Sequence, residues 1–462
     1  MVVLDLLAAW EGDPSRYVGY SRKADYFRKG GGYWNQMDNQ PILSERVFLR
    51  VIDFLTQSGL IANYVAAAGY SPMSSRMRAS KELIDDLRGA GVNWTGVGFD
   101  PEAPVIFVKD KDKKLAPFPD NEEFDFERAE VNLRRINANL QTTYINLDIS
   151  DADLEELGLR MRGDEEEMEG DSGEYREPFE LSNRSIRRIF SLGTFNAGGR
   201  FYGGWWQGIP GDYRKHIIID GAVTREMDFS SMQPRLMYAE VGAAAPEDAY
   251  DVPGWPSEVR PHAKKAFNQL INSDTSSRNE NQWHRFNPDM ELPSVPEDWS
   301  TLTKHERSRL RSARFMDVFK RPYQDLLSDL VEMHREIDSF FFSGAWGRMQ
   351  RLDSDIAERV MIKLLDRDVP VTALPIHDSF IVRRGAEADL LNAMHEAHME
   401  LVQAPCSITI EDAVFDTPDE EDERGIVRVS DILDETTKAI AGRRQFYQRA
   451  TEWQRAFGPV DV

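Results

Sequence analysis

The chain has 462 residues, 41% of them hydrophobic, and a formal net charge of −23. This length predicts two or three domains. The sequence contains no run near the roughly 18 apolar residues of a membrane span, and its apolar start lacks the positive flank of a secretory signal. A single cysteine, Cys406, excludes an internal disulfide framework and a cysteine-built zinc site, so we expect a cytoplasmic protein that does not enter membranes.

The negative charge argues against indiscriminate binding to nucleic acids or anionic membranes. It is unevenly distributed, however. Residues 163–174 and 417–423 are acidic and poor in large apolar side chains, which is typical of solvated linkers. The segments 183–188 (NRSIRR), 198–200 (GGR) and 213–215 (YRK) are locally basic, so one groove could still accommodate a polyanion.

The first third of the chain predicts a small domain followed by helices. Short helices are expected between Ser44 and Arg88, with Ser80 as a cap, and strands at 92–99 and 103–118. This order predicts a mainly helical or winged-helix domain over residues 1–115. Residues 116–177 then predict a thumb-like segment with a helix at Phe124–Leu140 and the first acidic linker. A continuous domain is expected over 178–416, followed within 417–462 by a second linker and an amphipathic helix at about 430–457.

The first candidate site lies near the middle of the chain. Residues 217–219 and 222–229 predict two strands joined at Asp220-Gly221, which is a strong hairpin signal. Ser230 and Gln233 have the spacing of a capping box, which predicts a helix start directly after the second strand. Asp228 is therefore expected where a strand gives way to a helix, at the end of a sheet. A rigid backbone at such a point suits a metal ligand.

The second candidate site is the predicted helix Arg260–Asn272. Pro261 is typical of a first helical turn, so Arg260 and Lys264 are expected one turn apart at the start of this helix. Two cations beside free backbone N–H groups can hold a polyphosphate. A solvated basic helix face is the alternative interpretation.

The third candidate site is the stretch ALPIHDSF, residues 373–380. It predicts a hairpin with His377 and Asp378 at its turn, which would bring Asp378 towards the strand end that bears Asp228. Two adjacent carboxylates repel each other, so this arrangement predicts bound divalent cations. The alternative is an ordinary turn in which Asp378 bonds its own backbone.

In this order, the three sites resemble the palm and fingers motifs of family A DNA polymerases and of the related phage-type single-subunit RNA polymerases. The matching segments are Asp228-Phe229-Ser230 with Arg235, Arg260 with Lys264, and His377-Asp378-Ser379. Two further segments are similar to the family, at 205–214 (WWQGIPGDYR) and 348–361 (RMQRLDSDIAERVM). The resemblance covers residues 183–416, about half of the chain.

The resemblance implies an α+β right-hand polymerase fold with an antiparallel palm sheet and helical fingers over residues 178–416. It implies a compact DNA polymerase without a proofreading exonuclease, of the kind carried by phages, plasmids or other mobile elements. Two Mg²⁺ ions, or Mn²⁺ in their place, would assist transfer from nucleoside triphosphates to a primer on a DNA template. The implied roles are catalysis and metal binding by Asp228, Asp378 and the Phe229 carbonyl; nucleotide binding by Arg260, Lys264, Asn268 and Gln233; and primer or template binding by Arg200, Gln207, Gln350 and His377.

Several positions depart from the DNA polymerase pattern. Asn268 stands where the fingers motif has an aromatic residue, and Gln233 stands where DNA polymerases have a glutamate that closes against the sugar. Ser379 matches the RNA polymerases instead. An RNA polymerase or primase therefore remains an alternative, as does an inactive polymerase-like module that binds nucleic acid.

Overall fold

The computed structural model describes most of the chain. The described residues are 2–12, 14, 16–24, 27, 34–35, 40–41, 44–65, 75–92, 103–120, 124–167, 180–273, 286–288, 290–292, 302–411 and 442–460. No helix in these ranges is long and apolar enough to cross a membrane.

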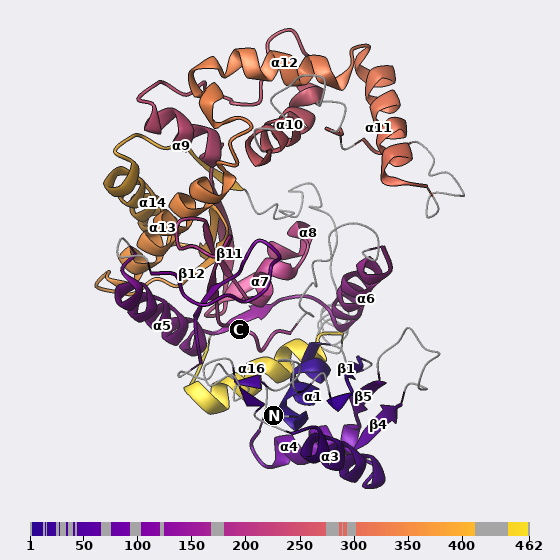
Figure 1. Ribbon diagram of the computed structural model, residues 1–462. Coiled ribbons are helices and arrows are strands. Elements are labelled where there is room, and N and C mark those ends of the chain that lie inside the picture. Colours follow the sequence, from indigo (N-terminus) through magenta and orange to yellow (C-terminus); the bar gives the residue numbers. More distant parts are fainter. Residues whose placement is uncertain are drawn as a thin grey trace, which may run out of the picture.

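The N-terminal unit has its own hydrophobic core, formed by residues between Val2 and Val92 (Figure 1). Its principal elements are α1 (Val2–Gly12), β1 (Val18–Tyr20), α3 (Glu45–Gln57), β4 (Ile61–Tyr64), β5 (Ser75–Ala79) and α4 (Lys81–Gly89), with a two-residue ladder between β2 (Trp34–Asn35) and β3 (Gln40–Pro41). The Ser80 hydroxyl accepts a hydrogen bond from Leu83 N at 3.2 Å, which confirms the predicted helix cap.

A three-stranded antiparallel sheet, in the order β1-β5-β4, accompanies the helices of this unit. The β4–β5 hairpin lies between α3 and α4, and not after them as the winged-helix prediction required. The first predicted wing strand, 92–99, lies almost wholly outside the described residues. The second contains β6 (Ile106–Val108), which pairs in parallel with β8 (Arg187–Phe190) and packs in the larger core. The winged-helix prediction is therefore wrong in the order of its elements, whereas the described helices of the unit are longer than its strands, as a mainly helical unit requires.

The larger body is built on a six-stranded sheet. Its central strand is β11 (Ala222–Phe229), which pairs along one edge with β13 (Ser379–Arg383). Along the other edge, the start of β11 pairs with β10 (Ile217–Ile219) and its end with β14 (Ile408–Glu411). The outer strands are β12 (Ala373–Ile376) and β7 (Ile145–Leu147), and all pairings are antiparallel. The predicted strands at 217–219, 222–229 and on both sides of the 377–378 turn are confirmed.

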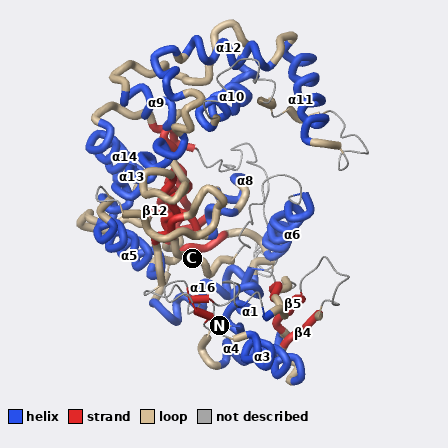
Figure 2. The backbone as a smooth tube through the Cα atoms, in the orientation of Figure 1, coloured by secondary structure: helices blue, strands red, loops and turns tan. Residues whose placement is uncertain are grey.

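Helices surround this sheet, whose strands lie near the centre of the larger body in Figure 2. The longest, α13 (Trp346–Leu365), contacts α14 (Glu387–Val402), α5 (Phe126–Thr142) and β9 (Gly198–Tyr202). A separate helical group lies at the end of the molecule far from the N-terminal unit (Figure 1) and contains α10 (Arg260–Asn272), α11 (Lys304–Phe319) and α12 (Tyr323–Met333). The remaining elements are α6 (Asp151–Glu167), α7 (Trp205–Gly208), α8 (Gly211–Arg214), α9 (Met232–Glu240), η2 (Ser257–Val259) and η6 (Arg335–Phe340).

The segment predicted as thumb-like is built into the core. Helix α5 packs on α13, and β7 extends the central sheet. Helix α6 continues to Glu167, so the first residues of the predicted acidic linker at 163–174 are helical. The predicted boundaries at 115 and 177 therefore do not coincide with the division between the hydrophobic clusters.

The C-terminal helix, α16 (Arg444–Phe457), contacts both α6 and β7 and also bonds to the N-terminal unit. Its Glu452 pairs with Arg88 at 3.4 Å, and Arg88 also pairs with Glu11 at 2.8 Å. Its Trp453 is 3% exposed and lies 5.6 Å from the Tyr144 ring. Residues 430–441 of the predicted helix lie outside the described residues.

Trp453→Ala should therefore destabilise the fold, by about 3–5 kcal/mol, because truncating a buried tryptophan leaves a cavity. The control is Tyr447→Ala, since Tyr447 lies on the same helix with 40% exposure and should matter much less. Urea unfolding followed by tryptophan fluorescence and circular dichroism measures the difference. Equal stability of the two variants would contradict the buried position of Trp453.

Candidate active site

Strand pairing brings the two predicted catalytic aspartates to one end of the central sheet. Asp228 is the second-last residue of β11 and lies opposite Ser379, the first residue of β13. Asp378 lies in the turn between β12 and β13, and its carbonyl accepts a hydrogen bond from Phe229 N at 3.2 Å. The backbones that carry the two acids are thus directly bonded although the residues are 150 positions apart. Both side chains are half-buried.

A buried phenol lies near both aspartates. The pKa of Tyr250 is raised, first by burial and then by the charge of Asp378, with Asp228 adding to the shift. A charge shifts the pKa of another group in this way only at short range. The Tyr250 ring also packs against the Phe267 ring of α10, with 6.0 Å between the ring centroids.

The predicted cations lie at the start of α10, as expected. Arg260 and Lys264 are exposed and lie one helical turn apart, and half-buried Asn268 follows one turn later. Arg260 has a partner that the sequence analysis did not anticipate, because its Nε donates to Asp248 Oδ2 at 2.5 Å. Its guanidinium also lies 5.5 Å from the Tyr250 ring centroid. Tyr250 thus packs directly against the start of this helix.

The predicted capping box at Ser230 and Gln233 is wrong. Helix α9 begins at Met232, and its N-cap is Ser231, which has φ 51° and makes no side-chain cap. The Ser230 hydroxyl bonds to Thr409 of β14 instead. The contact with Thr409 replaces the helix cap because β14 pairs with β11 up to Phe229, which places Thr409 beside Ser230. Gln233 is half-buried near the start of α9 and remains a predicted nucleotide contact.

Arg235, the last residue of the first palm-like motif, fixes the chain around this helix start. Its Nε donates to the Ser230 carbonyl at 3.0 Å, and its Nη2 donates to the Glu247 carbonyl at 2.9 Å. The guanidinium therefore joins the end of β11 to the loop that carries Asp248 and Tyr250.

Two residues predicted to contact primer or template have partners inside the chain. Arg200 forms a paired contact with Asp353 of α13, with Nη2 and Oδ2 2.5 Å apart. The Gln207 amide donates to the carbonyls of Phe201 at 3.0 Å and Pro375 at 2.9 Å, which holds α7 against β12. Both contacts position the elements that surround the aspartate turn. Binding of nucleic acid by Arg200 and Gln207 remains a prediction.

The other two predicted contacts are available at the surface. His377 is exposed in the β12–β13 turn, has φ 57°, and lies 5.8 Å from the Tyr202 ring. Gln350 is half-buried on α13. Their roles also remain predictions.

The glycines and aromatics of GGRFYGGWW, residues 198–206, serve packing. Gly199 has φ +82°, and a Cβ there would lie 2.8 Å from the Phe190 ring and 3.1 Å from Ser354 Oγ. Trp205 and Trp206 are buried in the main core. Close packing of β9 against β8 and α13 therefore accounts for these residue types.

The donor atoms at the candidate site suit a hard divalent cation. Two carboxylates, with the nearby Phe229 carbonyl, form an all-oxygen set, and Mg²⁺ in proteins is typically bound by one or two carboxylates together with substrate phosphates. Among the described residues, no group of three or more His, Cys, Asp or Glu side chains is placed to hold a metal. The residues present therefore fit magnesium that shares its ligands with a substrate, rather than a closed structural site.

In the sequence, Asp248 and Tyr250 lie between the first two candidate sites and carry no assigned role, and no signal singles out Asp353. Asp248 and Tyr250 lie in a loop with no spacing signal, and their importance follows only from contacts with Arg260 and the aspartates. Asp353 occurs in an ordinary amphipathic helix, and its burial depends on the packing of α13 against β9.

No protein-family model matches the sequence, and no curated protein matches it. Among solved structures, the chain is similar to the POL domain of Pol1 from M. smegmatis in complex with DNA primer-template and dNTP. The match has 13% sequence identity and a TM-score of 0.29, and it covers 71% of this chain and 63% of that chain. The match thus spans less than two thirds of that chain. A likeness at this level carries no functional argument, so the proposal below rests on the residues of this protein.

The Arg200–Asp353 pair predicts a measurable pH dependence. Burial raises the pKa of Asp353 from 3.8 to about 6 despite the pairing with Arg200. Because the folded protein binds this proton more tightly than the unfolded chain, the Asp353 carboxyl adds to the free energy of unfolding. This contribution is complete below about pH 4 and is lost as the pH rises through about 6. Relative to Asp353→Asn, which does not titrate, wild type should lose about 3 kcal/mol of unfolding free energy between about pH 4 and pH 7. Denaturant unfolding across this range tests it, and a constant difference between the two proteins would contradict it.

Proposed function

We propose that the protein is a metal-dependent nucleotidyltransferase, and more specifically a family A-like DNA-directed DNA polymerase without a proofreading domain. The observation that carries the proposal is the pairing of β11 with β13, which joins the backbones of Asp228 and Asp378 at one end of the sheet. Half-buried acids that share one neighbourhood repel each other. Such an arrangement is favourable where a divalent cation neutralises both.

In this proposal, Asp228, Asp378 and the Phe229 carbonyl would hold two Mg²⁺ ions. The chemistry that bound magnesium supplies in such a site is activation of an attacking hydroxyl and stabilisation of the departing pyrophosphate. The strands contribute rigidity, because β11 is paired on both edges near Asp228. The acids are thereby oriented before substrate arrives, which lowers the cost of assembling the site.

Arg260 and Lys264 would bind the triphosphate from the start of α10. Both are exposed, and the positive end of the helix dipole favours an anion there. Asp248 forms an ion pair with the Arg260 guanidinium, which is the group that would bind the phosphates. A nucleotide would displace this carboxylate. Asn268 and Gln233 would then contact the sugar and base, and His377, Gln350, Arg200 and Gln207 the primer or template.

The RNA polymerase alternative draws part of its support from Ser379. Its hydroxyl donates to Glu226 Oε1 at 2.6 Å, which is a structural role inside the sheet. Ser379 therefore gives no independent support for ribonucleotide use, and Gln233 is the remaining feature that favours it. Deoxynucleotides are our expected substrate.

Asp228→Asn and Asp378→Asn should each lower Mg²⁺-dependent primer extension by at least about 100-fold, because each removes a charge that would hold the ions. Asp220→Asn is the matched control. Asp220 also lies in a hairpin turn, but at the other end of β11, and asparagine tolerates its φ of 49°.

The assay is run with primed and unprimed DNA templates, and with either deoxy- or ribonucleoside triphosphates. Mg²⁺-dependent primer extension retained by Asp378→Asn would contradict the assignment of Asp378 as a catalytic metal ligand. Preferential unprimed incorporation of ribonucleotides would favour the RNA polymerase alternative. Absence of binding of both Mg²⁺ and triphosphate in calorimetry would favour an inactive nucleic-acid-binding module.

Asp248→Ala should lower the KM for nucleoside triphosphate, by up to about fivefold, because an exposed ion pair of ~0.2–1 kcal/mol no longer competes with the phosphates. Asp251→Asn is the control, since Asp251 is an exposed acid in the same loop and the ion pair of Arg260 is with Asp248. Steady-state kinetics separates KM from kcat. A higher KM in Asp248→Ala would mean that the carboxylate positions Arg260 for binding instead.

A further inference from the structure

The sheet of the N-terminal unit has one face that the proposed catalysis does not use. Side chains alternate between the two faces of a strand, and on β5 Ser75, Met77 and Ala79 are buried while Arg76 and Arg78 are only half-buried. Register places Tyr64 directly opposite Arg76. We call the surface formed by Tyr17, Tyr64, Arg76 and Arg78 the Arg/Tyr face.

Arginines and tyrosines stack on one another across this face. The Arg76 guanidinium lies 5.2 Å from the Tyr17 ring centroid and 5.0 Å from that of Tyr64, and Arg78 lies 5.1 Å from Tyr17. The tyrosines are 40% and 47% exposed. Among the described residues, neither Arg76 nor Arg78 has a carboxylate partner. The guanidinium groups are thus held in place by aromatic rings while their charge remains unneutralised.

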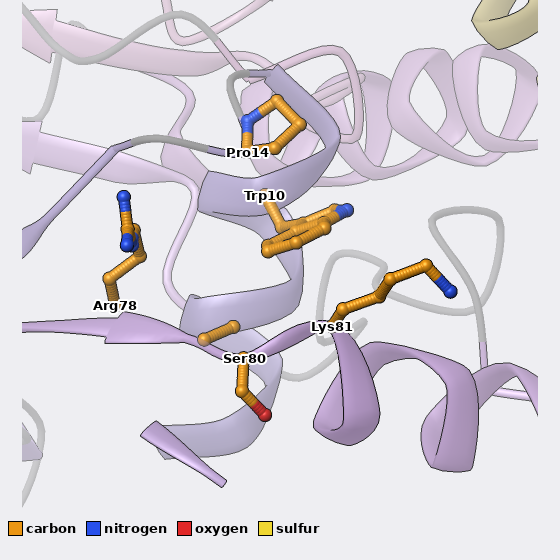
Figure 3. A pocket seen from close by; sticks show the side chains of 6 residues that line it. Trp10, Pro14, Arg78, Ser80 and Lys81 are labelled. Carbon is orange, nitrogen blue, oxygen red and sulfur yellow. The ribbon is translucent and has the colours of Figure 1, made fainter. Parts of the chain in front are cut away.

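A shallow, open pocket of about 340 Å³ adjoins the face at the end of β5. Trp10, Pro14, Arg78, Ala79, Ser80 and Lys81 line it. In Figure 3, the Trp10 ring lies between the Arg78 and Lys81 side chains, below Pro14. A flat aromatic ring between two cations suits a base and its flanking phosphates.

The charge of the unit also differs from that of the whole chain. Residues 1–92 contain 11 Lys and Arg and 10 Asp and Glu, whereas the whole protein has a net charge of −23. The N-terminal unit therefore lacks the negative field that would repel a polyanion. It also lies at the opposite end of the molecule from α10, α11 and α12 (Figure 1), so a strand held there is separate from the phosphate-binding helix of the proposed active site.

We propose that the Arg/Tyr face and the adjoining pocket bind single-stranded nucleic acid. Arg76, Arg78 and Lys81 contact phosphates, and Tyr17, Tyr64 and Trp10 stack on bases. Aromatic platforms interleaved with cations bind single strands with little sequence preference because every base has a π-face. A duplex hides its base faces in the stack and gains much less from exposed tyrosines.

The test is fluorescence anisotropy of the full chain with labelled oligonucleotides, in EDTA and without nucleotides, so that metal-dependent catalysis does not contribute. Arg76→Ala/Arg78→Ala should weaken binding to oligo-dT by at least about tenfold. The slope of log K against log salt should become shallower by about 1.4, since each phosphate contact on a single strand contributes about 0.7. Tyr64→Ala should weaken binding, and Tyr64→Phe, which keeps the ring, should restore it.

Arg46→Ala/Arg50→Ala is the matched control, because both arginines are exposed on α3 of the same unit. An equal loss in this control, an unchanged affinity in Arg76→Ala/Arg78→Ala, or equally tight binding of duplex DNA would overturn the proposal. Oligo-dT and oligo-U arms show whether the preferred strand is DNA or RNA.

A second measurement uses the wild-type protein, so its result does not depend on whether the alanine variants fold correctly. Photocrosslinking of bromouracil-substituted single strands to wild type, followed by mass spectrometry, should yield crosslinks in the peptides that contain Tyr17, Tyr64 or Trp10. Crosslinks confined to residues beyond 92 would contradict the assignment.

Discussion

Backbone pairing between β11 and β13 is the interaction on which the candidate site depends. It joins two segments 150 residues apart and sets Asp228 beside the turn that carries Asp378. Side chains alternate along a strand, so a register shift of one residue would send Asp228 to the other face of the sheet. The hydrogen bond from Phe229 N to the Asp378 carbonyl fixes this register at the place where the chemistry requires it.

Buried charges secure the elements behind the aspartate turn. Arg188, 1% exposed, joins β8 to the Gly199 carbonyl of β9 and to Glu358 of α13, at 2.8 and 2.5 Å. Together with the Arg200–Asp353 pair, it fixes α13 on β9 through specific bonds rather than through apolar contact alone. Buried ion pairs often contribute little net stability, but loss of one partner is strongly destabilising. These pairs therefore define a single arrangement of the layers around the site.

The parts of the fold with strong local signals could be predicted from the sequence. The Asp220-Gly221 hairpin, the strands around residues 377–378, the α10 start at Arg260 and the Ser80 cap all follow from short-range chemistry. Where a tertiary contact competes with the local pattern, prediction failed. Ser230 has the spacing of a capping box but bonds to Thr409, and the strand SRMRA of β5 is recognisable only once its pairing with β1 and β4 is known. No spacing signal marks Asp248 or Tyr250, because their roles arise from distant partners.

The central claim is that Asp228 and Asp378 hold the same ions, and a double-mutant cycle of metal binding tests it most directly. Mn²⁺ binding in the presence of a nucleoside triphosphate is measured by electron paramagnetic resonance for wild type, Asp228→Asn, Asp378→Asn and the double variant. If both aspartates bind the same ions, either single substitution should remove most of the bound Mn²⁺, and the double variant should lose little more. The two losses of Mn²⁺ binding would then be strongly non-additive. Independent, additive losses, or undiminished Mn²⁺ binding in either single variant, would contradict the account.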